Sequence, residues 1–309
     1  MTEILLETES LKQLLDLLEE KNIDRNTLDR YTNHKDVRRV LKLYKTFFGV
    51  GNKKHFIAEY FKVLKNGNYE DQYYLYETKR KIKELRELVT YIDNNMITLK
   101  KEMMSRIGKY ADVRLFKRIR VILYSGNTEK GTSPYPGIIY INVRHYINNK
   151  ESLLNVFVHE LYHSRSRDYS KFIKYYVGRS IAIKRHYYNT FGAIFEEGIA
   201  SLVELQETYQ TEDNQVITPE TLDHIESHFK SLTLHLETLK QNNPESSHLS
   251  YNLNYILGYY MARQIYLVYG KEGLDTWTRD YDYKRYLKLY ISACKQLEIK
   301  TYLEHQVLA

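Results

Sequence analysis

Apolar residues recur at helical spacing through most of the chain, and two short stretches break that period. In the first hundred or so residues, apolar positions three and four apart, such as Leu11, Leu14 and Leu18, predict a series of helices. Two β-branched runs follow, at residues 120–124 and 137–143, joined by a polar loop that contains glycine and proline. Such runs with such a loop are typical of strands.

From residue 151 onwards the helical period returns. It predicts helices at about residues 151–166, 190–208, 219–241, 250–269 and 283–305. We therefore expect a mainly α protein with a small antiparallel β-sheet, an α+β fold. The change of pattern predicts two domains: a helical N-terminal region at residues 1–115, and a second domain at residues 116–309.

Composition narrows the class of protein. Lysine and arginine outnumber acids by 46 to 39, but the charges are spread along the chain and no nucleic-acid motif is present, so we expect no nucleic-acid partner. The single cysteine, Cys294, excludes an internal disulfide and sits in an apolar helical segment. The start of the chain is acidic, unlike a secretory signal, and no run approaches the roughly 20 apolar residues of a membrane span. These features predict a cytoplasmic protein.

The candidate chemistry lies in His159-Glu160-Leu161-Tyr162-His163. On a helix, the two histidines lie one turn apart on one face, so both imidazoles can bind one metal ion. Glu160 lies about 100° round the helix from His159, where it can take a proton from a metal-bound water. This pattern supplies two ligands and a base for zinc-assisted hydrolysis.

The rest of this helix fits that geometry. Asn148 or Asn149 is placed to cap its start. The side opposite the histidines is apolar and consists of Leu154, Phe157, Val158 and Leu161.

A catalytic zinc needs a third protein ligand. The histidine and glycine of the longer three-histidine motif are missing, since Tyr169 and Ser166 stand at those places, and Asp168 fits no ligand spacing. The better source is the helix at 190–208, where Glu197 lies on the polar side and Glu196 lies nearer the apolar flank. A solvent-facing Glu197 is the alternative.

These elements resemble the gluzincin metallopeptidases, whose third zinc ligand is a glutamate. The segment Glu197-Gly198-Ile199-Ala200 resembles the Asn-Glu-Gly-Phe-Ala motif of their aminopeptidase branch, with Glu196 in place of the asparagine. Thermolysin-like members carry an aspartate where this chain has Ser201, whose hydroxyl could instead accept a bond from an imidazole.

The long gap between His163 and Glu197 resembles instead uncharacterised bacterial families of predicted zinc-dependent proteases. Those families share a later Tyr-x-x-Gly helix, which Tyr255 to Gly258 matches, and the resemblance covers residues 119–275. It implies a zincin-like core with one zinc ion per chain, held by His159, His163 and Glu197.

The resemblance also implies a mechanism. Glu160 would accept a proton from the zinc-activated water and pass it to the leaving nitrogen of a peptide or protein substrate. Tyr255 is our choice for the donor that stabilises the oxyanion. Three other tyrosines compete with it for that role, namely Tyr251, Tyr259 and Tyr260.

Alternatives remain at two levels. The strand at 137–143 is either an edge strand that pairs with an extended substrate or a purely structural one. A zinc amidase or small-molecule hydrolase would use the same ligands, and a non-catalytic regulatory protein would keep the metal fold without using Glu160. Glu160 argues against the non-catalytic protein, because a purely structural metal site has no use for a general base. Of the two enzyme classes, the peptidase is our leading prediction.

Overall fold

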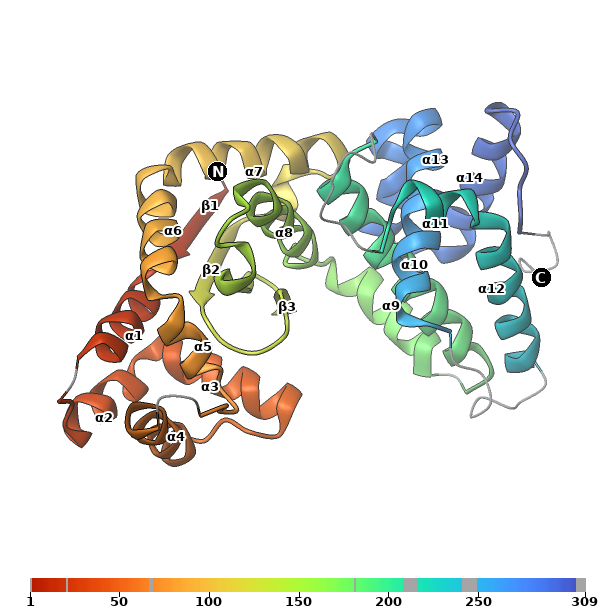
Figure 1. Ribbon diagram of the computed structural model, residues 1–309. Helices are drawn as coiled ribbons and strands as arrows, with labels where there is room; N and C mark the ends of the chain where they lie inside the picture. Colours follow the sequence, from red (N-terminus) through yellow and green to blue (C-terminus); the bar gives the residue numbers. More distant parts are fainter. Residues whose placement is uncertain are drawn as a thin grey trace. The chain divides into compact units, whose positions relative to one another are not determined.

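The computed structural model describes residues 2–20, 22–66, 69–180, 182–207, 216–240 and 249–303. Helices dominate, together with one four-stranded sheet, which confirms the mainly α prediction with a small β component (Figure 1). The chain divides into two compact units: residues 1–103 with 116–164, and residues 104–115 with 165–309. This division does not test the domain boundary predicted at residue 115, which stays a prediction.

The first unit contains the sheet, the helices before it and the helix that follows it. Its strands are β1 (Glu3–Glu7), β2 (Arg118–Tyr124), β3 (Gly131–Tyr135) and β4 (Ile138–Asn142). Its helices are α1 (Glu9–Glu19), α2 (Arg25–Asn33), α3 (Lys35–Phe48), α4 (Lys53–Lys65), α5 (Leu75–Arg80), α6 (Ile82–Asn94), the 3-10 turn η2 (Val143–Tyr146) and α8 (Lys150–His163). Helix α7 (Met96–Tyr110) begins in this unit and ends in the second.

The sheet is mixed, so the prediction of a small antiparallel sheet was wrong in this respect. Its strand order is β1-β2-β4-β3. β1 and β4 both run parallel to β2, and only β3 pairs antiparallel with its neighbour β4. The short connection between β3 and β4 is a hairpin, whereas the parallel pairs are joined by long segments, as parallel strands require.

The sequence pattern did not predict two of the strands, β1 and β3, and one interpretation of β4 gave it the wrong place within the sheet. β1 lies in a segment that was expected to be helical, although Ile4 and Leu6 alternate with more exposed positions as in a strand. β3 lies in the expected Gly/Pro loop. Two interpretations were open for residues 137–143, and the edge-strand one was wrong: β3 flanks β4 on its outer side, so β4 is interior and β3 is the edge.

The loop that leads into β3 is fixed by one buried side chain. Asn142, at the end of β4, donates its Nδ2 hydrogens to the backbone carbonyls of Gly126, Asn127 and Glu129 at 2.9–3.1 Å. Tyr44 of α3 also holds this loop, since its hydroxyl accepts a bond from the backbone N–H of Asn127 at 2.8 Å. The N-terminal helices therefore support the start of the edge strand.

The second unit is helical in its described part. Its elements are the 3-10 turn η1 (Val113–Leu115), α9 (Tyr169–Ser180), α10 (Ala182–Leu205), α11 (Pro219–Asp223), α12 (Ile225–Lys240), α13 (Tyr251–Thr278) and α14 (Tyr283–Gln296). The helices predicted from residue 190 onwards are thus confirmed with shifted ends, except that the one at 219–241 is split at His224. α13 is kinked at Gly270, where φ is 61°.

The core of this unit is formed by α10, α13 and α14. α10 and α13 pack along each other, and Figure 1 shows α13 also lying beside α14. Cys294 of α14 is fully buried, as its apolar neighbours predict. Among the described residues, no helix is both long and apolar enough to span a membrane.

Candidate metal centre

Helix α8 carries the two histidines and is built largely from local signals. Asn149 caps its start, with Oδ1 accepting from the backbone N–H of Ser152 at 2.9 Å. Its predicted apolar side is confirmed as core, since four residues there are at most 3% exposed: Leu154, Phe157, Val158 and Leu161. The helix ends at His163, where the backbone N–H of Ser164 bonds to the carbonyl of Glu160 at 3.1 Å. The packed side fixes the rotation of the helix and so aims the histidines.

The two imidazoles converge on one point. Their Nε2 atoms lie 3.2 Å apart, and His159 is only 8% exposed. Two nitrogens bound to one tetrahedral zinc at about 2.0–2.1 Å would lie about 3.3 Å apart. The pair therefore has the separation that two ligands of a single zinc ion require.

Glu160 is buried next to the edge strand. Its side chain is 7% exposed, although a glutamate is rarely so buried without a specific partner or function. Gly131, at the start of β3, faces it: an added Cβ at Gly131 would lie 3.0 Å from Cγ of Glu160 and 3.0 Å from Cγ2 of Val156. The glycine thus leaves room for the carboxylate beside the sheet edge.

We expect Gly131→Ala to displace Glu160 by a few tenths of an ångström. Because a misplacement of about 1 Å can cost about 100-fold in rate, we expect kcat to fall on the order of tenfold with zinc content unchanged. Steady-state kinetics with metal analysis measures both. Gly108→Ala is the matched control, since a Cβ there makes only an ordinary 3.4 Å contact with Val113. Wild-type kcat in Gly131→Ala would contradict a role for this contact in placing Glu160.

The two adjacent glutamates of α10, Glu196 and Glu197, have different surroundings. Its predicted apolar side is fully buried: Phe195, Ile199, Leu202 and Val203. Glu196 is bound by other groups: its carboxylate oxygens accept from Nη1 and Nη2 of the buried Arg165 at 2.6 and 2.8 Å, and Oε2 accepts from Nε1 of Trp277 at 3.0 Å. Glu197 is partly buried and lies about 100° further round the helix. This explains why Glu197 is the better candidate ligand.

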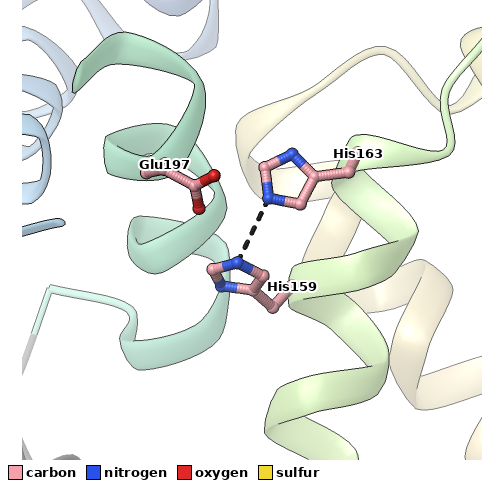
Figure 2. Close-up of side chains that lie close together, drawn as sticks. All are labelled: His159, His163 and Glu197. Carbon is pink, nitrogen blue, oxygen red and sulfur yellow. Dashed lines mark hydrogen bonds between the residues drawn. The ribbon is translucent and has the colours of Figure 1, made fainter. Parts of the chain in front are cut away.

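One group of three potential metal ligands is found among the described residues. Ligand atoms of His159, His163 and Glu197 lie within 4.8 Å of one another (Figure 2). Two imidazoles and a carboxylate are a donor set that suits zinc in hydrolytic sites. All three are residues that the sequence singles out.

The structure does not test the roles predicted for Tyr255 and Ser201. The hydroxyl of Tyr255 lies 2.7 Å from that of Tyr251, and its role at the oxyanion stays a prediction. The competing Tyr259 is fully buried and donates to the carbonyl of Gln206 at 2.7 Å, while Tyr260 packs against Phe229. Ser201 is buried beside Glu197 on the same helix, and its bond to an imidazole also stays a prediction.

The two motif glycines, Gly198 after Glu197 and Gly258 of the Tyr-x-x-Gly segment, meet where α10 crosses α13. A Cβ on Gly198 would overlap the backbone of Gly258, and a Cβ on Gly258 would overlap the carbonyl of Ile194. The backbones are in direct contact at this crossing, which only glycine permits. Tyr255 lies one helical turn before Gly258, and Glu197 directly precedes Gly198.

Two residues close to the candidate site or its neighbours in the chain, Arg165 and Gly131, were not predicted from the sequence. Arg165 follows His163 by two residues, but nothing in the pattern indicates that its partner lies some thirty residues on. Gly131 was part of an expected loop. A fully buried arginine and a strand glycine facing a carboxylate become visible only once the fold is known.

A family model described as “Putative zinc dependent peptidase (DUF5700)” matches residues 5–298, nearly the whole chain. No curated protein and no solved structure matches the chain.

Proposed function

Since this chain belongs to the DUF5700 family of putative zinc-dependent peptidases, we propose that it hydrolyses peptide bonds in the manner of a gluzincin, with one zinc ion per chain. The observation that carries the proposal is the convergence of His159, His163 and Glu197 next to a buried general base, Glu160. The family match supports zinc and peptidase activity at a coarse level. The residue roles below are our proposal.

The donor set fits zinc. His159 and His163 would each provide one imidazole nitrogen, and Glu197 one carboxylate oxygen, which leaves a fourth position open as catalytic zinc sites require. The 3.2 Å separation of the two Nε2 atoms supports this assignment. Bound there, zinc supplies a water of lowered pKa and polarises the substrate carbonyl.

The chain's own residues would move the protons. Glu160 accepts a proton as water attacks the amide carbonyl and delivers it to the leaving nitrogen. Its burial supports this role, because a carboxylate shielded from bulk water keeps the proton between the reacting groups. Tyr255 donates a hydrogen bond to the carbonyl oxygen as that oxygen gains negative charge.

An extended substrate would pair with the edge strand β3. Its outer side has no strand neighbour among the described residues, and Gly131 places the strand directly against Glu160. Main-chain pairing with an edge strand binds peptides without demanding a particular sequence. It also favours a peptide over a small amide, which cannot form such a ladder.

The experiment that tests the metal centre is zinc analysis of purified protein. We expect one zinc per chain in the wild type and, in Glu197→Gln, a zinc affinity weakened by more than about 100-fold, since even partners of metal ligands are worth about 10–100-fold. Competition with a chromogenic chelator measures this. Glu204→Gln is the matched control, two turns further on the polar side of α10, and should bind as the wild type does. Equal losses in both variants would refute Glu197 as a ligand.

A further inference from the structure

Arg165 is a fully buried arginine with a fixed set of partners. Its side chain has 0% exposure, and it makes two parallel hydrogen bonds to Glu196 at 2.6 and 2.8 Å. Nε of Arg165 donates to the carbonyl of Thr278 at 3.3 Å, and Trp277 donates to the same glutamate. Bidentate pairs of this kind are strong and directional, so they fix orientation as well as distance.

The pair lies next to two proposed metal ligands in the chain. Arg165 is two residues past His163, and Glu196 directly precedes Glu197. Two residues span at most about 7 Å, so the backbone at His163 can never be far from the arginine. The residues on both sides of Arg165 are held as well, since the carbonyl of Ser164 accepts from the N–H of Gly137 at 2.9 Å and the N–H of Ser166 donates to the carbonyl of Leu115 at 2.7 Å.

We propose that the Arg165–Glu196 ion pair is a positioning device for the metal centre, an inference that rests on the proposed zinc function. It ties the segment that leaves the histidine helix to α10 at the residue beside Glu197. Neither side chain touches substrate or zinc. The pair acts through the ligands, by limiting how far His163 and Glu197 can separate.

The pair also decides which of two adjacent glutamates binds the ion. Three donors bind the carboxylate of Glu196, two from Arg165 and one from Trp277, and the positive guanidinium balances its charge. A carboxylate held in this way is a poor ligand for a cation, because binding would break those bonds and leave a buried arginine unpaired. Glu197, the neighbouring glutamate outside this ion pair, is therefore the one that we assign to the zinc.

Three variants test this. Arg165→Lys keeps the charge but loses the bidentate geometry, and Glu196→Gln keeps the shape but loses the charge. The double variant Arg165→Met with Glu196→Met removes both charges, which is often neutral for stability when the volume is kept. We expect zinc Kd, measured by chelator competition on folded protein, to rise about 10–100-fold in all three. The double variant should show this rise with a Tm near that of the wild type.

The matched control is Arg120→Lys. Arg120 pairs with Glu7 at 3.0 Å and Asp36 at 3.1 Å in the first unit, and neither partner is a proposed zinc ligand or adjacent to one in the chain. We expect its zinc Kd to stay at the wild-type value. That result would show that changing the arginine of an ion pair to lysine is not by itself enough to weaken zinc binding.

The outcomes separate the two proposals. If the double variant regains both stability and wild-type zinc affinity, packing alone suffices and the positioning role is refuted. If the wild type binds one zinc and Glu197→Gln loses it, but all Arg165 and Glu196 variants keep the wild-type Kd, only this inference fails. If the wild type binds no zinc, the proposed function fails and this inference with it. Should Arg165→Lys not fold, the double variant decides.

Discussion

We expect replacement of Glu160 by glutamine to lower kcat for peptide hydrolysis by about 10³-fold, within the range of about 10²–10⁴ that general base catalysis contributes. The amide has the size and shape of the carboxylate, so the buried position beside Gly131 stays filled. It cannot accept the proton of the attacking water. Zinc content should stay at the wild-type level, because Glu160 is not among the three candidate ligands. Cleavage of a proteome-derived peptide library, followed by mass spectrometry, measures the loss.

The matched control is Glu151→Gln, an exposed acid in the first turn of the same helix. It should leave both zinc content and peptide cleavage unchanged. Stoichiometric zinc with undiminished hydrolysis in Glu160→Gln would show that the catalytic scheme is wrong. A wild type that cleaves small amides but no library peptide would support the amidase alternative.

Helix α8 could be predicted almost completely from sequence, because everything that specifies it is local. Its cap, its apolar side and the spacing of its histidines lie within one run of residues, and Asn149, Phe157 and His163 hold the places expected of them. The cap and the packed apolar side are enough to aim both imidazoles. A site on one rigid helix is the kind that sequence patterns predict best.

The sheet could not be predicted in the same way, because its pairing is non-local. β1 pairs with β2 by placing Glu3 opposite Arg118, across more than a hundred residues of helices. A five-residue segment with acids at both ends carries too little periodicity to identify its partner. β3 contains Pro134 and polar residues that are typical of a loop, and only its pairing with β4 makes it a strand.

The choice between Glu196 and Glu197 was predicted from the helix alone, but its cause was not. Periodicity places Glu196 toward the apolar flank without saying what that flank contains. The structure shows a buried arginine there, contributed by the segment just after α8. Such side-chain partners depend on tertiary packing, which a single sequence does not reveal.

Gly258→Ala is expected to be the most destabilising small substitution considered for this chain. The added methyl would overlap the carbonyl of Ile194 and the backbone of Gly198, so no side chain can move aside to admit it. Overpacking of a core costs about 1–3 kcal/mol and occasionally more, and we expect a loss of about 3 kcal/mol here, despite the helix-propensity gain of about 1 kcal/mol. Calorimetry should show Tm lowered on the order of 5–10 °C.

The same substitution should weaken zinc binding, because the crossing it opens lies one residue from Glu197. Gly108→Ala again serves as the control. Position 108 is helical and has room for a Cβ, so alanine should raise the free energy of unfolding by about 0.5–1 kcal/mol. If Gly258→Ala matched that gain, α10 and α13 would not be in backbone contact at this point. If it lost stability but kept wild-type zinc affinity, the two motif glycines would serve the core of the second unit alone, and the placement of Glu197 would depend instead on the ion pair beside it.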